Sequence, residues 1–122
     1  MANLGIIGHG IVGQAFEYGF KKGHKLFIYD KFQKTLSLDQ VVSKSEFIFI
    51  CLPTPMLGNG EGIDLKIIDD TLKKIVPNTN NTNKIITIKS TVVPGTTATY
   101  AKKYPKTNFA FNPEFLTEAN FL

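Results

Sequence analysis

Short apolar runs alternate along this chain with longer stretches in which apolar residues recur at helical spacing. The runs predict five strands, at 3–8, 25–30, 46–52, 84–89 and 108–112. Between them we expect helices from Ile11 to about residue 22, ended by Gly23, over 36–43, after a capping Asp64, and after Pro94. Strands joined by such helices imply right-handed crossovers. The pattern therefore predicts a single-domain α/β fold with a doubly wound parallel sheet of five or six strands.

The turn between the first strand and the first helix has the sequence Gly8-His9-Gly10-Ile11-Val12-Gly13. The first backbone N–H groups of a helix have no partner within the helix, and the helix dipole adds partial positive charge there. In this pattern the first glycine permits the turn, the second lets a pyrophosphate approach the backbone, and the third lets helix and strand pack closely. All six residues are candidate cofactor-binding residues, with His9 contributing its backbone. The pattern is typical of a Rossmann-type dinucleotide site.

Asp30 ends the second predicted strand, twenty residues after Gly10. A carboxylate at this position of a dinucleotide site accepts hydrogen bonds from the ribose hydroxyls of the adenosine. It would also repel a 2′-phosphate, so we expect NAD rather than NADP as the cofactor. A plain solvated strand end is the alternative interpretation.

Composition narrows the remaining function classes. The 122 residues are 43% hydrophobic and 20% charged, which fits one globular domain over 1–122 and contains no apolar run of membrane-spanning length. The net charge of +4 comes from scattered lysines without any arginine, so we expect no nucleic-acid partner. With no signal peptide in view and a single cysteine, Cys51, expected in the core, we predict a cytoplasmic location. Histidines and acidic residues lack ligand spacing, so we expect no metal site.

Three further motifs occur in order after the glycine turn and Asp30. They are Cys-Leu-Pro-Thr-Pro at 51–55, Lys-Ser-Thr-Val-Val-Pro-Gly-Thr-Thr at 89–97 and Asn-Pro-Glu-Phe-Leu at 112–116. With them the chain resembles the N-terminal NAD-binding domain of the UDP-glucose/GDP-mannose dehydrogenases, from residue 3 to residue 122. The cofactor domain of a 2-hydroxyacid or 6-phosphogluconate type dehydrogenase is an alternative hypothesis, but the Pro-Thr-Pro sequence within 51–55 argues against it.

The resemblance implies roles for individual residues. Gly8, Gly10 and Gly13 would hold the pyrophosphate of NAD and Asp30 its adenosine ribose, while Leu52, Pro53 and Thr54 would line the cofactor. Ser90 and Thr91 would lie at the carboxyl end of the fourth strand, with Thr91 holding a catalytic water. Glu114 would act as an acid/base group beside the sugar, and Glu118 would lie near cofactor and substrate. Thr91 could instead cap a helix, and the two glutamates could form a solvated helix face.

The chain also departs from the family pattern. Thr35 stands where the family usually has a basic residue, and the nucleophilic cysteine, the lysine and the asparagine of the second half have no counterpart. We therefore expect the C-terminal substrate and catalytic half to be absent, and the chain to act on a nucleotide sugar only with such a half. The alternative is a stand-alone, non-catalytic NAD-binding module, or a truncated or viral remnant. A homodimer through the C-terminal edge is a further possibility.

Overall fold

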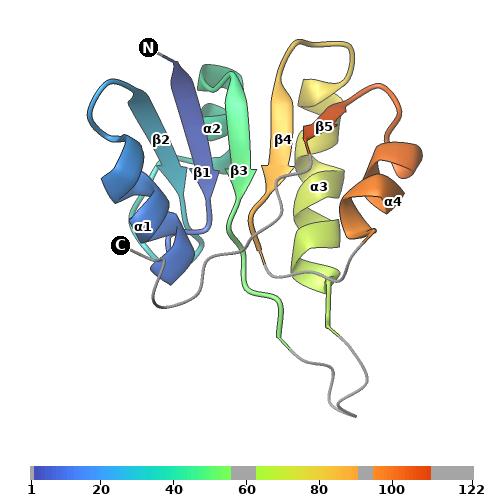
Figure 1. The fold of residues 1–122 in the computed structure, drawn as a ribbon, viewed down its shortest axis with the longest axis horizontal. Helices are drawn as coiled ribbons and strands as arrows, with labels where there is room; N and C mark the ends of the chain where they lie inside the picture. The colour runs from blue at the N-terminus through green and yellow to red at the C-terminus, as the bar shows by residue number, and fades with distance from the viewer. Residues whose placement is uncertain (1, 56–62, 91–94, 111–122) are drawn as a thin grey trace.

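The computed structural model describes residues 2–55, 63–90 and 95–110, and its centre is one parallel sheet (Figure 1). Its strands are β1 (Asn3–Ile7), β2 (Lys25–Tyr29), β3 (Phe47–Ile50), β4 (Ile85–Ile88) and β5 (Asn108–Ala110). They are hydrogen-bonded in the order β2-β1-β3-β4-β5, and every pairing is parallel. The predicted doubly wound α/β fold of Rossmann type is thus confirmed, with five strands in the described part of the chain.

Helices cover both faces of this sheet. They are α1 (Ile11–Phe20), α2 (Leu38–Lys44), α3 (Lys66–Thr79) and α4 (Thr96–Lys103). α1 lies on one face, across β1 and β2, whereas α2 and α3 lie on the other (Figure 1). This arrangement follows from right-handed crossovers, because the chain runs from β1 to β2 in one direction and from β2 through β3 to β4 in the other.

The register of the strands sorts their side chains into two layers. Ile48 and Ile86 are partners across β3 and β4, are fully buried, and belong to the core cluster that includes side chains of α2 and α3. On the opposite face Phe49 of β3 packs against Phe16 of α1, with ring centroids 4.2 Å apart. Each fully buried Ile contributes roughly 1.5–3 kcal/mol through the apolar area it removes from water. The continuous apolar runs of the sequence thus match strands covered on both faces.

α2 is only seven residues long and is stabilised at both ends. At its start Ser37 and Gln40 form a reciprocal capping box, each side chain accepting from the backbone N–H of the other residue. At its end the Lys84 ammonium donates to the backbone oxygens of Ser45, at 2.7 Å, and of Ser43, at 3.3 Å. Since Lys84 directly precedes β4, this contact fixes the helix against a strand some forty residues further along the chain.

α4 is tied to α3 through a buried aromatic residue. The Tyr100 hydroxyl donates to Oδ1 of Asp69 at 2.5 Å, and the Tyr100 side chain belongs to the same core cluster as the strands. Burial, the hydrogen bond to Asp69 and the negative charge of Asp69 all raise the pKa of Tyr100 above its usual value. The neutral phenol is therefore the form that the fold stabilises.

Several predicted element boundaries shift. α1 ends at Phe20, before the predicted residue 22, and Phe20 stacks on Phe16 while remaining 41% exposed. The predicted cap Asp64 lies one residue before the N-cap of α3, Leu65, although its carboxylate still accepts from the Lys66 N–H at 2.9 Å. α3 continues through Pro77 to Thr79, beyond the predicted helical stretch. Pro94 and the predicted end of the fifth strand, at 111–112, lie outside the described residues.

Candidate functional site

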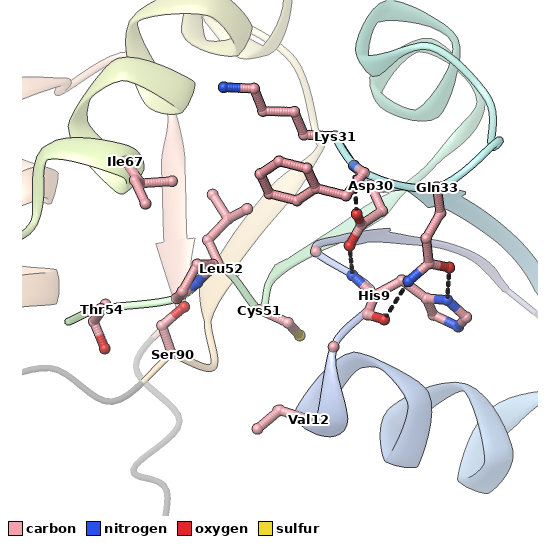
Figure 2. A pocket seen from close by; sticks show the side chains of 14 residues that line it. His9, Val12, Asp30, Lys31, Gln33, Cys51, Leu52, Thr54, Ile67 and Ser90 are labelled. Atoms are coloured by element: carbon pink, nitrogen blue, oxygen red, sulfur yellow. Dashed lines mark hydrogen bonds between the residues drawn. The ribbon is translucent and has the colours of Figure 1, made fainter.

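A cavity of about 580 Å³ lies at the carboxyl edge of the sheet, where an open α/β fold binds its ligands (Figure 2). Its walls come from the β1–α1 turn, from the segment after β2, from the corner after β3, from α3 and from the end of β4. The lining residues are Gly8, His9, Gly10, Val12, Asp30, Lys31, Phe32, Gln33, Cys51, Leu52, Pro53, Thr54, Ile67 and Ser90. Most of the residues predicted to bind a cofactor therefore meet in one cavity.

The three glycines of the turn meet three different requirements. Gly8 has φ +100°, and a Cβ there would lie 2.6 Å from the Cys51 carbonyl oxygen of the neighbouring strand end. A Cβ on Gly13 would lie 2.1 Å from the Gly8 carbonyl oxygen, so helix and strand pack directly against each other. A Cβ on Gly10 would meet nothing within 4 Å, which leaves the backbone open to the cavity. Gly8 and Gly13 serve the fold, whereas Gly10 leaves room for a ligand.

Asp30 connects the end of β2 to the glycine turn. One carboxylate oxygen accepts from the His9 N–H at 2.7 Å, and the other accepts from the Phe32 N–H at 2.8 Å. A carboxylate offers about four acceptor positions, so two backbone bonds leave positions for the hydroxyls of a ribose. Thr35, which replaces the expected basic residue, accepts from the Asp30 N–H through its hydroxyl at 2.9 Å. Asp30 thus fits the predicted ribose contact and also orders the turn itself.

The His9 side chain forms a network that sequence reasoning missed. Its Nε2 lies 2.7 Å from Oε1 of Glu17 on α1, and its Nδ1 lies 2.9 Å from Oε1 of Gln33 (Figure 2 shows the latter contact). The hydrogen bond to Gln33 raises the pKa of His9 most, burial opposes it, and the bond to and the charge of Glu17 raise the pKa further. The expectation of a purely backbone role for His9 is therefore incomplete.

The corner after β3 and the end of β4 form the other side of the cavity. The Cys51 N–H donates to the Ile7 carbonyl at 2.8 Å, and its side chain is buried as predicted. Leu52 and Thr54 project from this corner (Figure 2), and Pro53 also lines the cavity. Ser90 is buried and its hydroxyl donates to the Ile50 carbonyl at 3.3 Å, which joins β4 to the same corner.

Two apolar side chains at the cavity were not predicted. Phe32 is 87% exposed, and Ile67, at the start of α3, is 40% exposed. The sequence contained a signal for Phe32, because this residue follows Asp30, the predicted ribose ligand, by two positions. It contained no signal for Ile67, because only the fold brings α3 to this edge of the sheet. The predicted residues Thr91, Glu114 and Glu118 lie outside the described residues, and for Ile11 only the backbone, which begins α1, is described.

The described part of the chain contains neither a metal-binding cluster nor a membrane-spanning helix. No three His, Cys, Asp or Glu side chains within those residues come close enough to hold a metal ion. None of the helices described there has the length and apolar character needed to cross a membrane.

The family model and the sequence relatives point to the same family. The family model for the NAD-binding domain of the UDP-glucose/GDP-mannose dehydrogenase family matches residues 15–122. UDP-glucose 6-dehydrogenases of Rickettsia conorii and Campylobacter jejuni are each 34% identical to the chain, over 95 and 92 residues. Each match covers 75% of this chain but only 22% and 23% of the relative, so the matched part of the chain spans less than a quarter of the length of these enzymes.

Solved structures support the same fold. A UDP-glucose dehydrogenase from Pyrobaculum islandicum matches with a TM-score of 0.73 and 24% identity, covering 96% of this chain and 37% of that one. A GDP-mannose dehydrogenase from Pseudomonas aeruginosa gives a TM-score of 0.73 with 22% identity, covering 93% of this chain and 36% of that one. By its family match, the chain belongs to the UDP-glucose/GDP-mannose dehydrogenase family, as an NAD-binding domain whose cofactor is NAD.

Proposed function

We propose that this chain supplies the cofactor site of a nucleotide-sugar dehydrogenase that oxidises a sugar alcohol to a uronic acid, and that the reaction requires a further substrate-binding half. The observation that carries the proposal is the cavity at the carboxyl edge, where the glycine turn, Asp30, the corner after β3 and Ser90 meet. The family match begins at residue 15, after the glycine turn. The geometry of this turn is therefore independent support.

Different residues of the cavity would bind different parts of the cofactor. The open backbone at Gly10 and the start of α1 would hold the pyrophosphate, because unpaired N–H groups and the helix dipole both favour anions there. Asp30 would accept from the ribose hydroxyls, and Leu52 to Thr54 would line the next part of the cofactor. Ser90, on the far side of the corner, would face the nicotinamide end. Bound NAD supplies a hydride acceptor for the alcohol carbon.

The chemistry beyond hydride acceptance needs groups from elsewhere. Oxidation to the acid proceeds in this family through a thiol, and a reactive thiol must be accessible as a thiolate. Although Cys51 lines the cavity, it follows β3 as a core residue only 8% exposed, a setting that disfavours a thiolate, so we do not assign it as this nucleophile. We propose Thr91, Glu114 and Glu118 as the groups of this chain that hold water and move protons when the second half is present.

Titration calorimetry with NAD and NADP tests the cofactor site. We expect the wild-type chain to prefer NAD by about tenfold or more, since a carboxylate facing a 2′-phosphate costs at least about 1.4 kcal/mol. Asp30→Ala should lose both affinity for NAD and the preference. Asp39→Ala removes the same charge from the exposed first turn of α2, away from the cavity, and should bind like the wild type. Equal affinity of the wild type for both cofactors would contradict the role of Asp30.

A chimera tests the oxidoreductase assignment. The chain would replace the matching segment of the Rickettsia conorii enzyme, and NADH formation from UDP-glucose would be followed by absorbance. We expect turnover by the chimera, reduced turnover by the same chimera with Asp30→Ala, and none by the 122-residue chain alone. A chimera that is folded and binds NAD but lacks turnover would favour the non-catalytic module instead.

A further inference from the structure

Both ring nitrogens of His9 face oxygen acceptors. Nε2 lies 2.7 Å from the Glu17 carboxylate, and Nδ1 lies 2.9 Å from Oε1 of Gln33. The orientation of the Gln33 amide is fixed, because its NH₂ group donates to the His9 carbonyl at 3.0 Å. A neutral imidazole has one N–H and can satisfy only one of these acceptors, whereas an imidazolium donates to both. The hydrogen-bond geometry therefore selects the protonated ring.

The charges around the ring favour the same state. Glu17 faces it from α1 and Asp30 from the end of β2, and both carboxylates raise the pKa of His9 after the larger effect of Gln33. Lys31, the one basic residue among those lining the cavity, extends away from the imidazole (Figure 2). The His9 side chain is only 18% exposed, and its burial opposes protonation, but the hydrogen bond to Gln33 raises the pKa of His9 by more than burial lowers it.

His9 also joins the two segments that form the phosphate and ribose ends of the cavity. Its backbone N–H donates to Asp30, and its carbonyl accepts from the side-chain amides of Gln33 and of Gln14 on α1, at 3.0 and 3.1 Å. Loss of the ring proton breaks one of the two side-chain bonds that hold this residue. It also removes a positive charge beside the predicted pyrophosphate position.

We propose that His9 is a positioning residue whose imidazolium holds the glycine turn against the segment 30–33, so that NAD binds more tightly when His9 is protonated. This inference rests on the proposed cofactor site. NAD affinity should be highest at acidic pH and fall as the pH rises through the pKa of His9, because the bound dianionic pyrophosphate favours the charged ring. By linkage, NAD binding should raise the pKa of His9.

The test combines calorimetry with NMR on the full 122-residue chain. Between about pH 6 and about pH 8.5 we expect NAD affinity of the wild type to fall roughly three- to tenfold, since each unit by which NAD raises the pKa corresponds to tenfold. His9→Gln should remove this pH dependence. Glu17→Gln should move its midpoint to lower pH, because it replaces the carboxylate with a neutral amide of the same shape. ¹H–¹⁵N spectra of the imidazole should show the pKa of His9 above the ordinary histidine value and rising further with NAD.

His24→Gln is the matched control, because it removes the chain's other histidine, which accepts from the Ala2 N–H outside the cavity. It should keep the wild-type pH profile. NAD affinity that is equal at both pH values, or a profile that survives His9→Gln in a protein folded by circular dichroism, would overturn the inference and leave the proposed function standing. A folded wild-type chain that binds no NAD at any pH would overturn the proposed function and the coupling together, even where NMR shows a protonated His9.

Discussion

Replacement of Gly13 by alanine tests how closely α1 approaches the strand before it. The new Cβ would lie 2.1 Å from the Gly8 carbonyl oxygen and 3.1 Å from its carbon, and both atoms are backbone. The first distance is more than about 1 Å short of an ordinary van der Waals contact. Because Gly8 is itself confined by the Cys51 carbonyl, the turn has little room to yield. We expect a cost near the upper end of the roughly 1–3 kcal/mol typical of overpacking.

Gly19→Ala is the control on the same helix. A Cβ on Gly19 meets nothing within 4 Å, so this variant gains the helix propensity of alanine, about 0.5–1 kcal/mol, without a clash. Gly13→Ala gains the same propensity, so the difference between the two variants isolates the steric cost. Urea unfolding followed by circular dichroism should lower the midpoint for Gly13→Ala by about 1–2 M and raise it slightly for Gly19→Ala. Two equally stable variants would refute the close approach of helix and strand.

Three further variants separate fold from binding. Gly10→Ala should cost only about 0.5–1 kcal/mol of stability, because Gly10 is the N-cap of α1 and alanine is a poorer N-cap residue. It should nevertheless bind NAD about tenfold or more weakly, because its Cβ enters the cavity. Lys84→Met should lower the free energy of unfolding by about 1–2 kcal/mol in urea melts, since two carbonyls at the end of α2 lose their donor. Tyr100→Phe should cost about 1–2 kcal/mol at neutral pH. In the wild type the fold raises the pKa of Tyr100, so this residue contributes stability that is fully present below the ordinary tyrosine pKa of about 10. This contribution is lost progressively as the pH rises above that value. Melts at alkaline pH should therefore show a decline in the free energy of unfolding that Tyr100→Phe lacks.

The parts of the fold that the sequence predicted are those that depend on local patterns. The runs 47–50 and 85–88 are covered on both faces of the sheet, so they consist of apolar residues apart from the buried, β-branched Thr87, and such runs are typical of central strands. The glycine turn and Asp30 were also found, because their geometry requires particular residue types at particular spacings. Helix ends were predicted less well, because local breakers such as Gly23 and Pro77 do not mark the residues at which α1 and α3 end, Phe20 and Thr79.

The parts of the site that the sequence did not predict depend on contacts between residues that are distant along the chain. His9 occupies a variable position of the glycine pattern, and its role follows from Glu17 and Gln33, which lie eight and twenty-four positions away. The same holds for Ile67, which reaches the cavity because the α3 side chains around it share one core cluster with side chains of β3 and β4. A sequence motif specifies the backbone that faces a ligand, whereas the side chains that support this backbone become visible only in the folded structure.

Asp30 shows why these two roles must be measured separately. Its carboxylate accepts from two backbone N–H groups, so loss of NAD binding in an Asp30 variant has two causes, the missing ribose contact and a loosened turn. Asp30→Asn separates them, because an amide keeps one acceptor oxygen but turns an NH₂ group toward the second N–H. The unbound variant should unfold about 1–3 kcal/mol more easily than the wild type, the cost of an unsatisfied donor. An unbound Asp30→Asn chain as stable as the wild type, with NAD affinity lost, would show that the carboxylate acts on the ribose alone.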